Sequence, residues 1–245
     1  MTYFDRVKEI QQFKRPGYDA WTIVCQNSSA YLLALIRNSP ITPNQLTIAS
    51  CIAAIGAGLL ILKTDYLSAF LASILVQLSF IIDCGDGQYA RYKKMYSPFG
   101  PWLDIFCDRI REFVLFMCLV ERFSYTNEHA WLWGFYALFI LVLYHGEANT
   151  KLPFSDEKDK ALAREHEKGL IRKIMHLRVK LNIGAFYIGE QYFLISLFLL
   201  LNRIDLLFYA FTLYGSIIVF SYPAYKYYHY SLLNKCNQPV QEKNQ

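Results

Sequence analysis

The sequence lacks the cysteine and histidine patterns of a domain held together by metal or disulfides. Its six cysteines include no CxxC pair and no Cys/His spacing typical of a zinc site. We therefore expect free thiols in apolar or reduced surroundings. The first residues also lack the basic and then apolar profile of a signal peptide, so membrane targeting would come from internal segments. No internal repeat or low-complexity segment is evident.

Apolar residues, by contrast, are abundant and concentrated in long runs rather than spread at amphipathic spacing. Six of these runs approach the roughly 20 residues that an α-helix needs to cross a bilayer. The runs are, approximately, Ile41–Leu62, Tyr66–Ile82, Pro101–Val120, Ala130–Tyr144, Ile183–Leu201 and Leu206–Tyr222. The sequence therefore predicts an all-α integral membrane protein with six transmembrane helices.

The more polar segments divide the chain into three parts. Residues 1–40 form an N-terminal arm, in which Ala20–Ile36 mixes apolar and polar residues as an amphipathic helix on a membrane surface does. A plain soluble arm is the alternative. Residues 41–232 form the six-helix membrane domain, which contains one long charged cytoplasmic connection, residues 147–182. Residues 233–245 form a polar C-terminal tail.

Lysine and arginine are scarce on one side of the predicted spans. That side has only Lys63, Arg122 and Arg203, whereas the termini and the other connections hold the rest. Because short loops rich in Lys and Arg stay in the cytoplasm, both termini are predicted to be cytoplasmic. The basic residues follow this sidedness, so the net charge of +5 does not indicate nucleic-acid binding.

Four aspartates lie where the second apolar run ends and the third begins. Asp83 and Asp86 are three residues apart, and Asp104 and Asp108 are four apart, so each pair shares one helix face. The proline break at residues 98–101 lets the chain reverse, and the pairs would then face each other at the cytoplasmic edge. Acids inside a membrane are costly and functional by default. Oxygen ligands alone favour Mg²⁺ or Mn²⁺, and two such ions about 4 Å apart clamp both sides of a phosphoryl displacement.

Small and basic residues accompany the aspartates. Gly87 and Ala90 share a helix with the first pair and Gly100 precedes the second, which would let a bulky nucleotide approach the backbone closely. Arg91, one turn from Gly87, would pair with a phosphate. Each residue alone has an ordinary explanation, such as a helix-packing glycine or an arginine that ends a span. Together they favour a nucleotide site.

The order D-x2-D-G-x2-A-R-x8-G-x3-D-x3-D resembles the signature of the CDP-alcohol phosphotransferase (class I CDP-alcohol phosphatidyltransferase) family, and residues 43–47 are also similar to that family. The resemblance implies a homodimer in which an acceptor hydroxyl attacks the β-phosphorus of a CDP-alcohol and CMP leaves. It implies two divalent cations, Mg²⁺ or Mn²⁺, held by Asp83, Asp86, Asp104 and Asp108. Asp108 would also be the catalytic general base. The implied nucleotide-binding residues are Asp83, Gly87, Ala90, Arg91 and Gly100.

The signature does not select the alcohols. Family members use glycerol phosphate, serine, inositol or its phosphate, or a lipid as acceptor, and the donor here would be CDP-diacylglycerol or a soluble CDP-polyol. A pocket for a phosphorylated acceptor is one interpretation of the basic residues Arg109, Arg111, Arg172, Lys173 and Arg178. Alternatively, Arg109 and Arg111 simply balance the acidic cluster.

An ion- or proton-coupled transporter is the main alternative function, because acids inside a membrane also form ion relays. Their clustering at one edge, with glycines and an arginine at spacing that suits a nucleotide, favours the enzyme. We therefore expect a multi-pass enzyme of phospholipid or related phosphodiester biosynthesis. Its active site would face the cytoplasm, in a bacterial or archaeal inner membrane rather than in an organelle.

Overall fold

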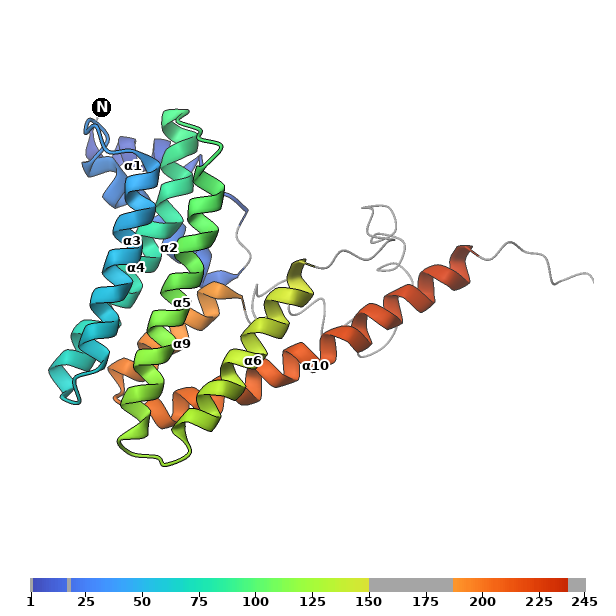
Figure 1. Ribbon diagram of the computed structural model, residues 1–245. Coiled ribbons are helices and arrows are strands. Elements are labelled where there is room, and N and C mark those ends of the chain that lie inside the picture. Colours follow the sequence, from blue (N-terminus) through green and yellow to red (C-terminus); the bar gives the residue numbers. More distant parts are fainter. Residues whose placement is uncertain (1, 17–18, 150–186, 238–245) are drawn as a thin grey trace, which may run out of the picture.

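The structure is a computed structural model that describes residues 2–16, 19–149 and 187–237. These residues form eight helices and no strand, in agreement with the predicted all-α class (Figure 1). The helices are α1 (Tyr3–Gln11), α2 (Ala20–Leu35), α3 (Pro43–Ile61), α4 (Tyr66–Lys93), α5 (Gly100–Ser124), α6 (Ala130–Asn149), α9 (Ile188–Leu200) and α10 (Ile204–Asn237).

Side chains that cap the helix ends determine where α3 and α4 begin. The Thr42 hydroxyl accepts a hydrogen bond from the Gln45 amide, and the Gln45 side chain accepts one from the Thr42 amide. Pro43 occupies the first turn, where its missing N–H costs nothing. Asp65 caps α4 in the same way by accepting from the amide of Ser68. These caps place the start of α3 and of α4 at opposite ends of the helix bundle.

Helix α3 packs against both α4 and α5, and the three helices are seen together on one side of Figure 1. Small residues allow this close approach, among them Ala54 and Ala57 of α3, which are fully buried. At Gly58 a methyl group would lie 3.0 Å from Val114 Cγ1 of α5. Helix α4 continues without a break from its apolar part through the aspartate signature, so residues 83–91 are helical as predicted.

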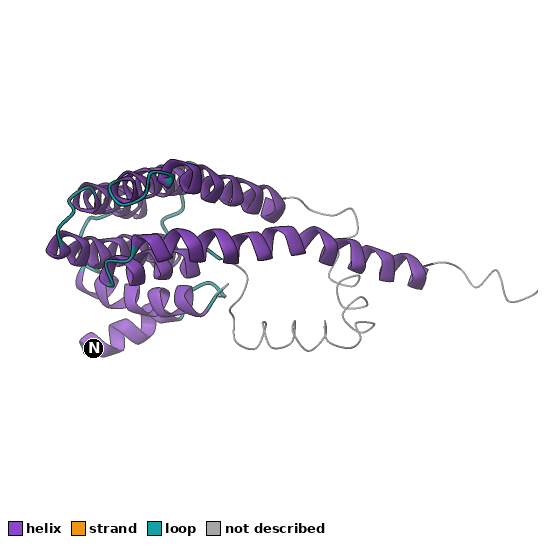
Figure 2. Cartoon of the chain, turned by 90° about the horizontal axis from the view of Figure 1, so that it is seen from below, coloured by secondary structure: helices purple, strands orange, loops and turns teal. Residues whose placement is uncertain are grey.

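The remaining helices pack around these three. Helix α2 packs against α1, α4 and α9, and α9 packs against α4. Helices α6 and α10 pack against each other and extend away from α3 and α4, as Figures 1 and 2 show from two directions. Helix α10 continues through Pro223 to Asn237. Its C-terminal part therefore lies far from the bundle centre.

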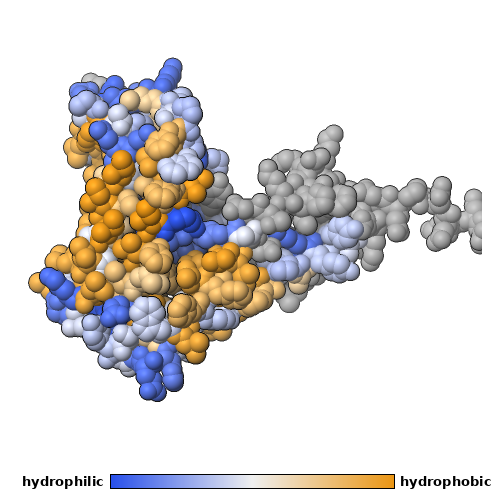
Figure 3. Space-filling view, viewed as in Figure 1, coloured by the Kyte–Doolittle hydropathy of each residue, from blue (hydrophilic) through white to orange (hydrophobic). Residues whose placement is uncertain are grey.

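Three helices are long and apolar enough to cross a membrane, namely α3, α4 and the part of α10 from Ile204 to Tyr228. The apolar segments Ala130–Gly146 and Ile188–Leu200 are shorter. Hydrophobic side chains cover most of the middle of the face seen in Figure 3, around one hydrophilic patch, and further hydrophilic ones gather at its two ends. This distribution is that of a membrane protein, because lipid tails require an apolar surface. Six crossings remain a prediction.

Helix α2 lies where a helix was predicted, but its two faces differ from the usual soluble pattern. The buried face carries Cys25, Ser29 and Ala30. The exposed side chains include Tyr31 and Leu35, the latter 71% exposed. An apolar exposed face suits contact with lipid, and the position of α2 on the membrane surface stays a prediction. The described cysteines 25, 51, 84, 107 and 118 are unpaired, as expected.

Arg122, near the end of α5, joins two turns at the end of the bundle remote from the aspartates. Its side chain is buried and donates to Asn202 Oδ1, 2.8 Å away in the turn between α9 and α10. It also donates to main-chain carbonyls at the end of α3 and in the turn before α4, which belong to Ile61, Lys63, Thr64 and Asp65. A single guanidinium thus satisfies several carbonyls that the helix end leaves without partners.

Replacing Gly134 with alanine should lower the apparent unfolding temperature of the detergent-solubilised protein. Gly134 lies in α6 against Val120 of α5, and a Cβ there would overlap the valine side chain. Such overpacking typically costs about 1–3 kcal/mol. Gly146→Ala in the same helix is the matched control, because a Cβ there meets no described atom within 4 Å. Adding Val120→Ala should recover part of the loss, and equal shifts for both glycine variants would contradict the packing argument.

Candidate active site

Three carboxylates from two helices meet beside the junction of α4 and α5. Asp83 comes from α4 and Asp104 and Asp108 from the first three turns of α5, and one oxygen of each lies within 4.8 Å of the others. All three side chains are half-buried. Lys94, with a left-handed φ of 56°, ends α4 and precedes the reversal after which α5 packs against α3. The structure therefore brings together three of the four predicted aspartates.

Asp86 lies one turn further along α4 and has other partners. Its carboxylate accepts hydrogen bonds from the Thr47 hydroxyl of α3 and from the Gly87 amide, and the residue is only 7% exposed. The structure does not place Asp86 in the three-carboxylate group. Sequence reasoning singled out residues 43–47 but gave Thr47 no role. Residue spacing along one helix does not reveal a hydroxyl that faces the signature from a neighbouring helix.

Arg111 is the positive charge of this cluster. It lies one turn beyond Asp108 and is fully buried. Its Nη2 lies 2.6 Å from Asp83 Oδ1 and also pairs with Asp108 Oδ1. Its Nη1 donates to Ser50 Oγ of α3 at 3.3 Å. These contacts join three helices, and they support the interpretation that Arg111 balances the acids.

The donor atoms of the cluster suit a hard divalent cation. The three carboxylates supply only oxygen, the ligand type that Mg²⁺ and Mn²⁺ prefer. Asp83 Oδ1 is buried and accepts no geometrically good hydrogen bond from the described residues, although it is ion-paired with Arg111. One guanidinium against three carboxylates leaves a net negative charge. The residues present therefore fit a bound metal ion.

The predicted nucleotide residues line the same end of α4 and the start of α5. A Cβ at Gly87 would lie 3.4 Å from Arg91 Nη1, and one at Gly100 would lie 3.3 Å from Asn44 Oδ1. Ala90 is half-buried on the same helix. Arg91 Nε donates to the carbonyl of Phe13 at 2.6 Å. Arg91 is therefore held by the chain between α1 and α2, a contact that sequence reasoning did not predict.

The N-terminal arm is attached to the signature helix by two further residues that the sequence did not single out. Gln88 is fully buried, accepts from Ser29 Oγ at 2.7 Å and donates to the Ile10 carbonyl at 2.9 Å. The Tyr89 hydroxyl donates to the Ile36 carbonyl at 3.1 Å. Both occupy variable positions of the signature, where only the three-dimensional contact reveals a role. The arm therefore packs directly against the helix that carries the signature.

A comparison with known protein families identifies the family of this chain. A profile described as CDP-alcohol phosphatidyltransferase matches residues 40–219, most of the chain. The chain belongs to this family. The resemblance predicted from the aspartate signature is therefore confirmed. Because the family consists of transferases, the transporter alternative finds no support.

Two relatives of this family member illustrate the similarity. A bifunctional IPC transferase and DIPP synthase from Aquifex aeolicus (strain VF5) is 29% identical over 167 residues, which are 68% of this chain and 34% of the relative. A phosphatidylinositol phosphate synthase from Corynebacterium glutamicum is 40% identical over 88 residues, 36% of this chain and 39% of the relative. The chain thus spans little more than a third of the length of either relative.

The structure places the candidate acceptor residues in different surroundings. Arg109, one residue beyond Asp108, has a side chain 43% exposed and pairs with Glu112 at 2.6 Å. Glu112 in turn lies 3.3 Å from His145 Nε2 of α6. Arg109, Glu112 and His145 line one end of a cavity of about 250 Å³ whose other walls are apolar. The candidates Arg172, Lys173 and Arg178 lie outside the described residues.

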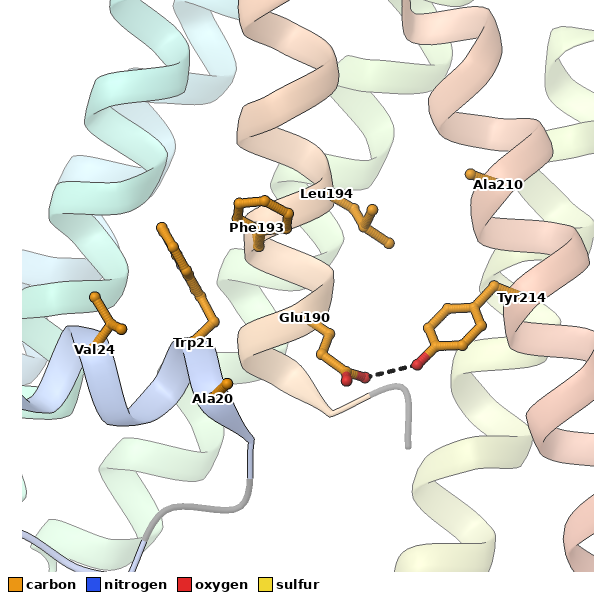
Figure 4. Close-up of a pocket in the computed structure, with 8 residues that line it drawn as sticks. All are labelled: Ala20, Trp21, Val24, Glu190, Phe193, Leu194, Ala210 and Tyr214. Atoms are coloured by element: carbon orange, nitrogen blue, oxygen red, sulfur yellow. Dashed lines mark hydrogen bonds between the residues drawn. The ribbon is translucent and has the colours of Figure 1, made fainter. Parts of the chain in front are cut away.

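A second cavity, of about 420 Å³, lies between α2, α9 and α10 (Figure 4). Its walls are almost entirely apolar and include Trp21 and Phe193. The exception is Glu190, whose carboxylate accepts a hydrogen bond from the Tyr214 hydroxyl at 3.0 Å. The Trp21 indole donates to Gln77 Oε1, six residues before Asp83 on α4, which is a helical rise of about 9 Å. An apolar chamber therefore lies beside the helix that carries the acids.

Proposed function

We propose that this membrane protein transfers a phosphoalcohol group from a CDP-alcohol to an acceptor hydroxyl and releases CMP. The observation that carries the proposal is the convergence of Asp83, Asp104 and Asp108, in a chain of this family. In the proposed step the acceptor oxygen attacks the β-phosphorus and forms a new P–O bond. The bond from that phosphorus to the bridging oxygen breaks, and its electron pair leaves with CMP.

Each site residue has a proposed part in this step. Asp108 accepts the proton of the acceptor hydroxyl, which raises the nucleophilicity of that oxygen. When bound, two Mg²⁺ or Mn²⁺ ions would neutralise the diphosphate and the leaving CMP. The residues that would hold them are Asp83, Asp86, Asp104 and Asp108. Gly87, Ala90 and Gly100 leave room for the nucleotide, and Arg91 pairs with a phosphate.

We further propose six membrane crossings with both termini in the cytoplasm, α2 on the membrane surface, and a homodimer. The distribution of lysine and arginine supports this sidedness, and the exposed apolar side chains of α2 support its contact with lipid. The aspartate cluster then faces the cytoplasm, where soluble nucleotides are found. The two named relatives come from bacteria, which supports a bacterial inner membrane.

The proposed donor is CDP-diacylglycerol, and the proposed acceptor is inositol phosphate or another polyol phosphate. The apolar chamber between α2, α9 and α10 supports a donor with an acyl chain. The relative named as a phosphatidylinositol phosphate synthase supports the acceptor, as does the exposed guanidinium of Arg109 next to Asp108. The product would be a phospholipid.

The test is CMP release by the purified protein in detergent, measured for each pairing of donor and acceptor. The donors are CDP-diacylglycerol and a soluble CDP-polyol, and the acceptors are inositol, inositol phosphate, glycerol phosphate and serine. We expect CMP only when both substrates are present, with the fastest release from CDP-diacylglycerol and a phosphorylated polyol. No release from any pairing, together with ion flux in vesicles, would overturn the enzyme proposal. Release without stimulation by any phosphorylated acceptor would overturn the acceptor assignment alone.

A further inference from the structure

Arg111 has the environment of an internal cation rather than of a residue that receives substrate. It is the largest fully buried side chain among those described, and its contacts reach α3, α4 and its own helix. Its exposed fraction is 0%, so no surface of the guanidinium is open to an incoming acceptor. Arg109, two residues earlier, is 43% exposed and directed to Glu112 instead.

The guanidinium occupies carboxylate oxygens that belong to the proposed metal ligands. Nη2 contacts Asp83 Oδ1 and Asp108 Oδ1, which come from the two helices that any shared cation would have to bridge. A carboxylate oxygen that pairs with a cationic N–H has less of its lone-pair density available for a metal ion. The guanidinium charge, which proteins do not remove, also repels a divalent ion placed nearby. Arg111 and the metal therefore compete.

The hydrogen bonding of Arg111 is incomplete in this arrangement. Its Nε is buried and finds no hydrogen-bond partner among the described residues. A buried donor without a partner costs free energy. The position between Asp83 and Asp108 is therefore held mainly by the two carboxylate contacts of Nη2.

We propose that Arg111 is a built-in counter-cation, which holds Asp83 and Asp108 together in the metal-free protein and thereby sets the metal affinity of the site. The proposal rests on the proposed metal-dependent function and adds a positioning role for one residue. Without Arg111, three half-buried carboxylates would repel one another across the junction of α4 and α5. With it, the site is assembled before metal arrives, at the expense of weaker metal binding.

The experiment measures Mn²⁺ affinity and thermal unfolding for wild type, Arg111→Met, Arg111→Lys and the matched control Arg109→Met. Free Mn²⁺ is followed by electron paramagnetic resonance, and unfolding is followed with chelator and with saturating Mn²⁺. We expect Arg111→Met to bind Mn²⁺ about tenfold or more tightly, because one repelling charge is gone. The same variant should unfold at a clearly lower temperature in chelator and recover with Mn²⁺. Arg111→Lys, which keeps the charge, should stay close to wild type.

Arg109→Met should change Mn²⁺ affinity by less than about twofold, because an exposed charge is screened by water and salt. Unchanged or weaker Mn²⁺ binding by Arg111→Met would overturn the role proposed for Arg111. If the wild type binds Mn²⁺ in the same experiment, the proposed function still stands. Absence of Mn²⁺ binding in wild type and in Arg111→Met would overturn both. If Arg111→Met does not fold, the double variant Asp83→Asn with Arg111→Met removes the charge together with one partner. Its Mn²⁺ affinity is compared with that of Asp83→Asn alone, and equal affinities would contradict competition.

Discussion

Asp108→Asn should reduce the rate of CMP release by at least about 10³-fold. A positioned general base contributes about 10²–10⁴-fold, and the same carboxylate is a proposed metal ligand. Asparagine keeps the shape and one oxygen of the side chain but accepts no proton from the acceptor hydroxyl. The affinity for CMP, measured by equilibrium dialysis with labelled CMP, should therefore fall less than the rate of CMP release. CMP release above about a tenth of the wild-type rate would contradict the assignment of Asp108 as base.

Asp65→Asn is the matched control for this experiment. Asp65 caps the opposite end of α4 by accepting from the Ser68 amide, and asparagine caps helices equally well. We expect unchanged CMP release and an unchanged apparent unfolding temperature. A comparable loss of activity in Asp65→Asn would mean that the effect of Asp108→Asn does not come from the site.

Removing divalent cations should abolish CMP release altogether. The proposed transition state places the charge of a diphosphate beside three carboxylates, and one guanidinium does not neutralise both. We expect release to fall to background in excess EDTA and to return on addition of Mg²⁺ or Mn²⁺. The control is the same treatment at matched ionic strength with the chelator already saturated by Mg²⁺.

The metal-depleted protein should nevertheless remain folded, because Arg111 still pairs with Asp83 and Asp108. Circular dichroism before and after EDTA should therefore be superimposable, and the loss of activity should be reversible. Full turnover in protein shown by elemental analysis to be free of divalent metal would contradict the proposed chemistry. Irreversible unfolding in EDTA would contradict the role given to Arg111 and leave the chemistry intact.

The part of this site that the sequence predicts is the part that depends on spacing along one helix. Asp104 and Asp108 share a face because they are four residues apart, and the reversal after Lys94 brings Asp83 opposite them. Helix α4 runs through the signature as expected, because nothing between Tyr66 and Lys93 interrupts it. Local rules of this kind follow from helical geometry and need no knowledge of the rest of the chain.

What spacing does not predict are the contacts between distant segments. Two sets of hydrogen bonds join residues far apart in the sequence. Thr47 donates to Asp86, and Gln88 accepts from Ser29 and donates to the Ile10 carbonyl. The burial of Arg111 also depends on distant segments, because its side chain is enclosed by α3 and α4 and not by its own helix alone. Two interpretations of Arg111 were open from the sequence, and only packing distinguishes them.

The opposite ends of the bundle are fastened in different ways. At one end Arg122 joins the turn between α3 and α4 to the turn between α9 and α10 through neutral carbonyls and an amide. At the other end Arg111 joins α5 to α3 through Ser50 and to α4 through the carboxylate of Asp83. The fastening at Arg122 therefore does not depend on divalent cations, whereas the fastening at the acid end uses the same carboxylates that would hold them.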